Sequence, residues 1–305
     1  MKYLLCALAT AFSLLAQPAM AALNVFACEP EWGALAQELG GDKVSVYNAT
    51  QALQDVHHVQ AKPSLIARMR SASLVACTGL ELEVGWLPMV LRQAGNAAVQ
   101  PGKPGYFEAG NYVPRLEIPQ RLDRADGDVH AQGNPHIQLD PRNIAKVGVA
   151  LAQRLAEVDP ANAAYYQARQ KDFAQRWQSA IQRWENQARP LKGVAVVVQH
   201  KAFPYLSDWL GLREVATLEP RPGVEPTSSH LAEVLAQLQQ HPARMVIRAA
   251  YNDERASIWL SERAKIPPVV LPFTVGGADH ANDLFGLFDV TVARLLDAIS
   301  TDAPK

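Results

Sequence analysis

The stretch DPANAAYYQARQKDFAQRWQSAIQRWENQA, residues 159–188, predicts the element around which the rest of the chain is arranged. Its large apolar side chains are spaced by seven, four, four and three residues, so they share one face of a helix: Tyr166, Phe173, Trp177, Ile181 and Trp184. Proline is favoured in the first turn, as at Pro160, and Asp159 is expected to cap the helix. At 1.5 Å per residue this helix would span about 40 Å, which is long enough to join two lobes.

Short strand-like runs alternate with helical patterns on both sides of this helix. Strands are expected at LNVFA (23–27), VSVYNA (44–49), SLVAC (73–77), LEI (116–118), GVAVVVQ (193–199), EVATLE (214–219), ARMVIRAAY (243–251) and PPVVLPFT (267–274). A helix is expected over residues 80–94, ended by Gly95. Such alternation predicts parallel sheets with flanking helices. The predicted fold is therefore α/β, with two similar lobes joined by one long rigid helix.

Residues 1–21 have the pattern of a secretory signal peptide. Lys2 gives a positive start, residues 3–16 form an apolar run, and residues 19–21 read Ala-Met-Ala, an A-x-A cleavage site. The apolar run is too short to cross a bilayer, so we expect no membrane insertion. Because no lipobox cysteine stands at the cleavage point, the sequence predicts a soluble exported protein.

The composition is that of an ordinary globular protein, with 305 residues, 49% hydrophobic and 19% charged. Loss of Lys2 with the signal peptide would change the formal net charge from −1 to −2. No basic patch stands out, so neither nucleic acid nor an anionic membrane is expected as a partner. After the signal peptide at 1–21, we expect an N-terminal lobe at 22–140, linking helices at 141–189 and a C-terminal lobe at 190–305.

Two cysteines remain after the signal peptide, and each ends a run with strand character. Cys28 follows LNVFA, and Cys77 closes SLVAC. Parallel strands that end side by side would bring the two sulfur atoms together, and an exported protein meets oxidising conditions. The residues leave two possibilities open, a disulfide bond or two inert buried thiols.

Three of the eight histidines share a context. His57 and His200 follow predicted strands, and His136 lies in NPHIQLDP (134–141), where Pro135 bars a helix and Asp140 is expected to open one. If the strand ends of two sheets face one cleft, the three imidazoles converge there. Imidazole nitrogens with a carboxylate suit Zn²⁺. The alternative is that each histidine only satisfies a hydrogen bond of its own.

The motifs around these histidines resemble those of a known family. DVHHVQAKPS (55–64), NPHIQLDP (134–141), the DPAN step (159–162) and QHKAFPYL (199–206) occur in the order found in the periplasmic metal-binding proteins of ABC transporters, cluster A-I. The resemblance extends from about residue 24 to the C-terminus. It implies two α/β lobes joined by a rigid helix, with the metal between them. It also implies that His57, His136 and His200 are metal ligands.

The resemblance bears on the choice of metal and on the fourth ligand. Manganese-binding relatives usually carry a glutamate at the third position, so His200 indicates zinc. The family usually places an aspartate soon after the last strand, but the alignment of PFTVGG (272–277) puts Val275 there. We therefore predict Asp279 as the fourth ligand. Asp283, which could instead cap the last helix, His280 and water are the alternatives.

His130 lies in a loop with acidic residues, at a place where relatives often carry a histidine-rich stretch. Together with Asp123, Asp126 and Asp128 it could hold zinc weakly or meet a delivering partner. The alternative is an ordinary solvated loop.

These observations predict a monomeric periplasmic carrier that captures Zn²⁺ between its lobes and delivers it to the permease of an ABC importer. The resemblance also allows loading by a periplasmic zinc metallochaperone. A carrier of Mn²⁺ or another divalent metal in the same family is the first alternative. The second is a three-histidine zinc hydrolase with an open water position. The chain contains no HExxH or GxSxG motif, so we expect a protein that is not an enzyme.

Overall fold

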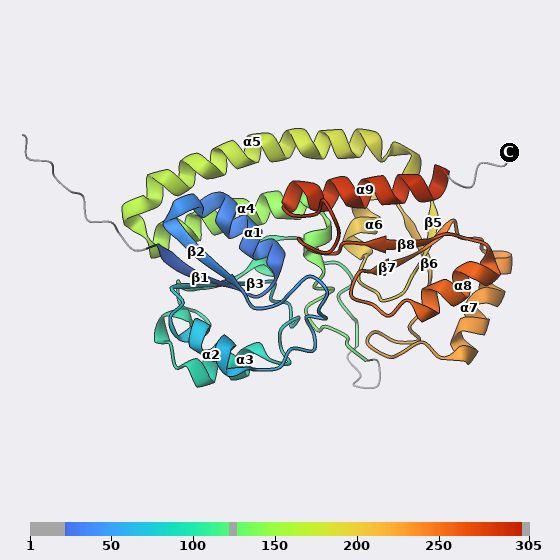
Figure 1. Cartoon of the computed structure of the whole chain (residues 1–305), viewed down its shortest axis with the longest axis horizontal. Coiled ribbons are helices and arrows are strands. Elements are labelled where there is room, and N and C mark those ends of the chain that lie inside the picture. The colour runs from blue at the N-terminus through green and yellow to red at the C-terminus, as the bar shows by residue number, and fades with distance from the viewer. Residues whose placement is uncertain (1–21, 122–126, 301–305) are drawn as a thin grey trace, which may run out of the picture.

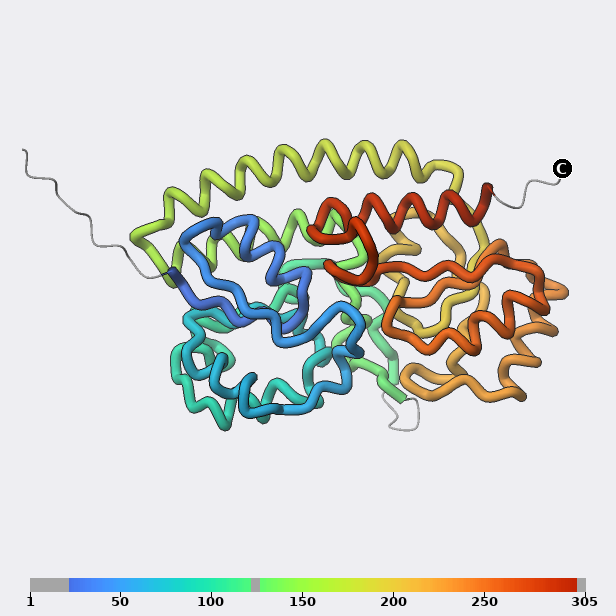
Figure 2. Tube along the Cα trace, viewed as in Figure 1, coloured from blue at the N-terminus to red at the C-terminus, as the bar shows by residue number. Residues whose placement is uncertain are grey.

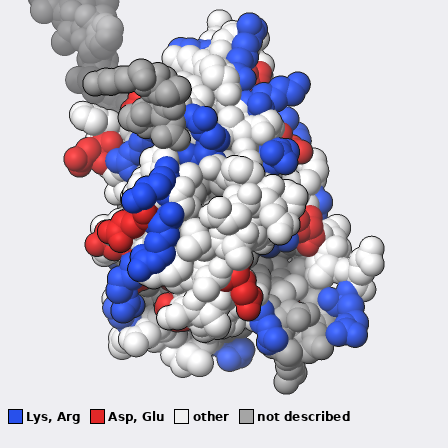
Figure 3. Space-filling model, turned by 90° about the vertical axis from the view of Figure 1, so that its right-hand side faces the viewer, with Lys and Arg blue, Asp and Glu red and all other residues white. Residues whose placement is uncertain are grey.

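The computed structural model describes residues 22–121 and 127–300. The predicted signal peptide, Asp123 and Asp126 lie outside the described residues. Within those two ranges, no helix combines the length and the apolar character that a membrane span requires. Figure 3 shows the end of the molecule formed by the C-terminal half, where acidic and basic side chains are mixed.

The first lobe is built on a parallel sheet with the strand order β2-β1-β3-β4 (Figure 1). Its elements are β1 (Leu23–Ala27), α1 (Pro30–Gly40), β2 (Val44–Asn48), α2 (Pro63–Arg70), β3 (Leu74–Cys77), α3 (Leu87–Ala94) and β4 (Tyr106–Glu108). Side chains alternate across a strand, so Val25 packs into the core on the α1 face and Phe26 into the core under α2 and α3. The predicted α/β lobe is confirmed.

Two predicted elements of this lobe are wrong in detail. The fourth strand is not at 116–118, because Glu117 has φ +52°, a left-handed conformation that a strand does not accommodate. The helix predicted over 80–94 begins only at Leu87, since Leu80 and Glu81 have φ values of +54° and +68°. The turn formed by residues 80–86 brings Glu83 inward, where it is buried.

The second lobe repeats the arrangement of the first, with the strand order β6-β5-β7-β8 and all pairs parallel. Its elements are β5 (Ala195–Val198), α6 (Pro204–Leu210), β6 (Arg213–Thr217), α7 (Ser228–Gln240), β7 (Met245–Ala249), α8 (Arg255–Ala264), β8 (Pro268–Leu271) and α9 (Leu284–Ser300). The backbone bond from Gln199 N to Ile247 O, 2.8 Å, matches the bond from Cys28 N to Ala76 O, 2.9 Å. His200 therefore follows β5 at the place that Glu29 takes after β1.

The linking helices are α4 (Pro141–Val158) and α5 (Ala163–Gln187). Asp140 caps α4 as predicted, because its side chain accepts a hydrogen bond from Arg142 N at 2.8 Å. The predicted cap at Asp159 is wrong. Its carboxylate accepts instead from Asn162 Nδ2 at 2.7 Å and Tyr166 Oη at 2.6 Å, and a 3₁₀ turn precedes α5.

A single apolar core runs through both lobes and the long helix. The predicted aromatic face of α5 is buried and packs against α9, which begins beside α1 in the middle of the molecule and runs along α5 to the far end of the second lobe (Figure 1). The Trp177 ring lies 4.8 Å from the Phe285 ring, and its indole N–H donates to Pro141 O at 2.8 Å. Because α1, α5 and α9 share this core, the two lobes are held at a defined separation.

Candidate metal centre

His57, His136 and His200 come together between the two sheets, as the sequence predicts. Each offers a ring nitrogen, and the three nitrogens lie within 4.8 Å of one another. The ring centroids are 5.5 to 5.7 Å apart. Figure 2 shows that the loop after β2 and the segment before α4 both reach the middle of the molecule, between the two lobes.

A short local pattern orients two of the histidines. Asp55 Oδ1 accepts hydrogen bonds from both His57 N, 3.0 Å, and His57 Nδ1, 2.8 Å. Asn134 Oδ1 does the same for His136, at 3.0 and 2.9 Å. An Asp or Asn side chain readily bonds the backbone two residues ahead, so the pattern Asp/Asn-x-His sets the backbone and the ring at once. Sequence reasoning missed this role, although the pattern is present in the chain.

The third histidine is oriented from farther away. His200 Nδ1 lies 2.7 Å from Glu219 Oε2, which stands 19 residues later, just after β6. Neighbouring parallel strands β5 and β6 end side by side, which brings the two side chains together. No local sequence pattern marks this pair, and sequence reasoning did not identify Glu219.

All three Nδ1 atoms are thus hydrogen-bonded to oxygen acceptors, which leaves the Nε2 atom of each ring available to bind a metal. Nε2 of His57 and of His136 is buried, and neither has a hydrogen-bond partner among the described residues. Burial, together with the nearby His200 and His57, keeps the pKa of His136 well below its usual value, so this imidazole is neutral and able to bind a metal. Second-sphere acceptors of this kind fix the tautomer and direction of metal-binding imidazoles.

The acceptors also supply negative charge. Burial raises the pKa of Asp55, but the hydrogen bonds from His57 and the charge interactions with His57 and His58 together outweigh burial, so the pKa is lowered. Asp55 and Glu219 thereby place two carboxyl groups behind the imidazoles of His57 and His200. Their combined charge matches that of a divalent cation, which reduces the cost of holding the ion away from water.

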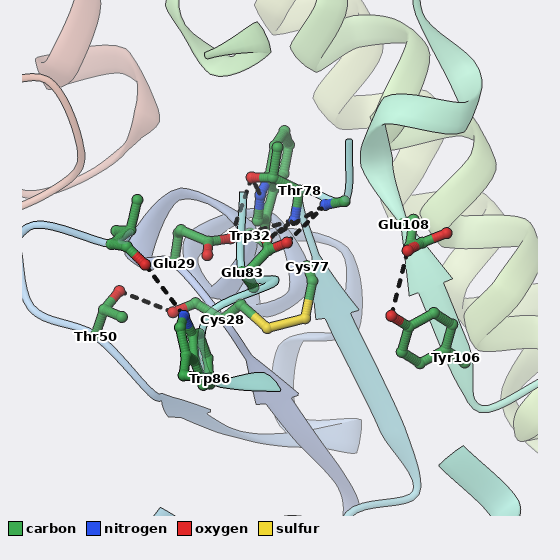
Figure 4. Close-up of a disulfide and its surroundings, with 12 residues drawn as sticks. Cys28, Glu29, Trp32, Thr50, Cys77, Thr78, Glu83, Trp86, Tyr106 and Glu108 are labelled. Atoms are coloured by element: carbon green, nitrogen blue, oxygen red, sulfur yellow. Dashed lines mark hydrogen bonds between the residues drawn. A yellow bond between two sulfur atoms is a disulfide. The ribbon is translucent and has the colours of Figure 1, made fainter. Parts of the chain in front are cut away.

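A disulfide bond joins Cys28 and Cys77 beside this region (Figure 4), which decides between the two possibilities left open by the sequence. Trp86 belongs to the same apolar cluster as the two cysteines, and its indole N–H donates to Val56 O at 3.1 Å. Val56 directly precedes His57. Through this apolar cluster the disulfide stabilises Trp86, whose hydrogen bond to Val56 O anchors the His57 loop.

Two buried carboxyl groups near the disulfide have raised pKa values. Glu29 and Glu83 are buried next to Thr78, whose backbone N–H donates to both at 3.2 and 2.7 Å (Figure 4). Burial raises the pKa of Glu83 to about 7, and burial together with the nearby charges of Glu83 and Glu31 raises the pKa of Glu29 well above its usual value. The pair is buried in the interior of the N-terminal lobe.

The structure does not bring Asp279 into the histidine group. Its side chain is exposed, and among the described residues the group of nitrogens within 4.8 Å is formed by the three histidines. Asp283 takes the role of a helix cap, since its carboxylate accepts from Gly286 N at 2.7 Å at the start of α9. His280 is exposed. Asp279 as a ligand stays a prediction.

His130 lies beside the triad, which contradicts the alternative that it belongs to an ordinary solvated loop. Its ring is 5.4 Å from the His57 ring, and its Nε2 is buried with no partner in the described part of the chain. Burial and the neighbouring His57 lower the pKa of His130 to about 4. A cavity of about 620 Å³ opens onto His130, His136 and His200 from the side of Lys201 and Pro222, and it connects the histidines to solvent.

Comparison with known proteins agrees with this geometry. The family model described as ZnuA, zinc-uptake complex component A periplasmic, matches residues 25–298. The chain belongs to this family. Membership in the zinc-uptake complex component A family makes it the metal-binding component of an ABC-type uptake system.

Individual relatives are distant. The chain is 22% identical over 255 residues to a manganese ABC transporter substrate-binding lipoprotein, PsaA, from Streptococcus anginosus, which covers 82% of this chain and 79% of the relative. It is 24% identical over 204 residues to the high-affinity zinc uptake system protein ZnuA of Yersinia pestis, covering 61% and 63%. A crystal structure of ZnuA superimposes with a TM-score of 0.75 at 20% identity, over 91% of this chain and 99% of the other. The likeness in structure shows a common fold.

Proposed function

We propose that the protein is a periplasmic zinc carrier that binds Zn²⁺ between its lobes through His57, His136 and His200 and delivers it to the permease of an ABC importer. The observation that carries the proposal is the orientation of the triad. Each Nδ1 is engaged by an oxygen acceptor, so three Nε2 atoms are available to one ion. The names of the relatives include both zinc and manganese proteins, so the choice of ion rests on the donor atoms.

The donor set favours zinc. Imidazole nitrogen suits Zn²⁺, whereas Mn²⁺ is better served by carboxylates, carbonyls and water. At this centre the carboxylates of Asp55 and Glu219 accept hydrogen bonds from Nδ1 of His57 and His200, so they are not free to bind the ion directly. A manganese site would need such carboxylates in direct contact with the ion.

The same arrangement favours a carrier over a hydrolase. A zinc hydrolase needs a carboxylate or similar base facing the metal-bound water. Asp55 and Glu219 are the carboxylates hydrogen-bonded to the triad, and both are committed to histidines. The pattern of residues 1–21 supports export to the periplasm, where a zinc metallochaperone could load a monomeric carrier.

The test is calorimetric titration of the metal-stripped mature protein with Zn²⁺ and, separately, with Mn²⁺. We expect one tight zinc equivalent, much weaker manganese binding, and a loss of zinc affinity in His57→Ala, His136→Ala and His200→Ala that exceeds the roughly 10- to 100-fold typical of a second-sphere change. His241→Ala, an exposed histidine at the end of α7, is the matched control. Manganese binding as tight as zinc, or zinc binding indifferent to the triad, would refute the proposal.

A further inference from the structure

Residues 127–134 form a segment that is hydrogen-bonded to both lobes next to the triad. On the N-terminal lobe, Ala131 N donates to Glu81 Oε2 at 2.6 Å. On the C-terminal lobe, Asp128 N donates to Pro222 O at 2.9 Å. We call residues 127–134, together with residues 219–223 that they contact, the clasp.

Two glycines allow the clasp to close. Gly127 has φ +82°, and a Cβ atom at this position would lie 2.1 Å from Pro222 O. Gly223 has φ +74°, and a Cβ atom there would lie 2.1 Å from Asp128 Oδ2. A side chain at Gly127 would collide with the backbone carbonyl of Pro222 and force the two segments apart, whereas a side chain at Gly223 would displace the Asp128 carboxylate; the left-handed backbone favours glycine at both positions. The approach of the two segments is therefore specified on both sides.

The clasp carries His130 to the metal centre. The separation of 5.4 Å between the His130 and His57 rings is as small as the separations within the triad. His130 Nε2 is buried and lacks a partner within the described residues, and burying such an atom is costly unless something binds it. A metal ion at the triad would provide that partner.

We propose that His130, rather than the Asp279 expected from the sequence, is the fourth metal-binding side chain, and that the clasp holds it there. This inference rests on the proposed zinc site. His130 is not a member of the group of nitrogens within 4.8 Å, so its ring moves from its place beside His57 toward the ion as the ion binds. Four imidazole nitrogens then complete a tetrahedral sphere, and Asp55 and Glu219 behind them balance the charge.

The clasp also links His130 to His200. Glu219 Oε2 accepts one hydrogen bond from His200 Nδ1, 2.7 Å, and another from Gly223 N, 2.8 Å. Opening the clasp at Gly223 would therefore disturb the oxygen that orients His200 while it withdraws His130. Two of four ligands would weaken together, which provides a route for release of a tightly held ion.

The experiment measures zinc affinity by chelator competition, zinc dissociation by stopped flow, and the number of imidazole ligands by zinc K-edge X-ray absorption. His130→Ala is compared with Asp279→Ala, and His241→Ala serves as control. We expect four imidazoles in the wild type and three in His130→Ala, with at least a tenfold loss of affinity and faster dissociation. We expect Asp279→Ala to match the wild type.

A second pair of variants tests the clasp without removing a ligand. Gly127→Ala introduces the clash with Pro222, whereas Gly102→Ala introduces the same strain, at φ +82°, where nothing lies within 4 Å of the new atom. We expect faster zinc dissociation in Gly127→Ala alone. The role of His130 would be overturned, and the triad left intact, if His130→Ala kept wild-type zinc affinity and four imidazole ligands. A loss of zinc affinity in Asp279→Ala instead of His130→Ala would have the same meaning. A wild type that does not bind zinc would overturn the proposed function as well.

Discussion

Glu219 offers the sharpest test of how the centre is built, because it acts on the metal only through His200. Its carboxylate is 12% exposed and lies 2.7 Å from His200 Nδ1. We predict that Glu219→Gln weakens zinc binding and that Glu219→Ala weakens it further. Glutamine keeps an acceptor oxygen but removes the charge, and alanine removes both, leaving His200 Nδ1 and Gly223 N without the acceptor they share.

The magnitude follows from distance. A Zn–N bond of about 2.0 Å, the width of the ring and the hydrogen bond place the carboxylate oxygen roughly 7 Å from a bound ion. At an effective dielectric constant of about 20, a divalent ion and one carboxylate charge at that distance interact by about 4.7 kcal/mol, which is an upper bound because the ligands share part of the ion's charge. Removal of a partner that acts on the metal through a ligand typically lowers affinity by about 10- to 100-fold, or about 1.4 to 2.7 kcal/mol, which lies within that bound. We therefore expect a loss of roughly 10- to 100-fold for Glu219→Gln.

The assay is competition with a chromophoric zinc chelator, with circular dichroism to confirm that each variant is folded. Glu233→Gln, an exposed carboxylate on α7, is the control for loss of one negative charge in the same lobe. Wild-type affinity in Glu219→Gln and Glu219→Ala would refute the reasoning. Equal losses in both would show that the charge, and not the hydrogen bond, is what matters.

Three further outcomes follow from the fold. The double variant Cys28→Ser, Cys77→Ser should lose up to about 4 kcal/mol in urea unfolding, because the bond spans 49 residues, and should bind zinc more weakly through the Trp86 anchor of the His57 loop. Because burial raises the pKa of Glu83 to about 7 from 4.5, its contribution to stability is complete below pH 4.5 and is lost as the pH rises through 7. Glu83→Gln should flatten that part of a stability-against-pH profile, a change of up to about 3 kcal/mol. Trp177→Ala should destabilise the metal-free protein by about 3–5 kcal/mol in the same urea assay, since the indole is fully buried in the core that the two lobes share.

Much of the fold could be predicted because it depends on local rules. Strand β1 has the predicted bounds, Leu23–Ala27, and Asp140 caps α4. The errors lie where the backbone takes left-handed φ values, at Leu80, Glu81 and Glu117. Those conformations are imposed by contacts with the rest of the protein, and periodicity cannot reveal them.

For the site, the sequence by itself determined which histidines stand at strand ends or in a stiff turn. It also determined the Asp/Asn-x-His pattern that orients two of them, because that hydrogen bonding acts over two residues. Only the tertiary structure decided that Glu219 orients His200, that the cysteines pair, and that His130 enters the centre while Asp279 stays exposed. Each of these depends on which strand ends lie side by side and how closely two loops approach. Such proximity is set by the packing of whole sheets and by the space at Gly127 and Gly223, which no local pattern encodes.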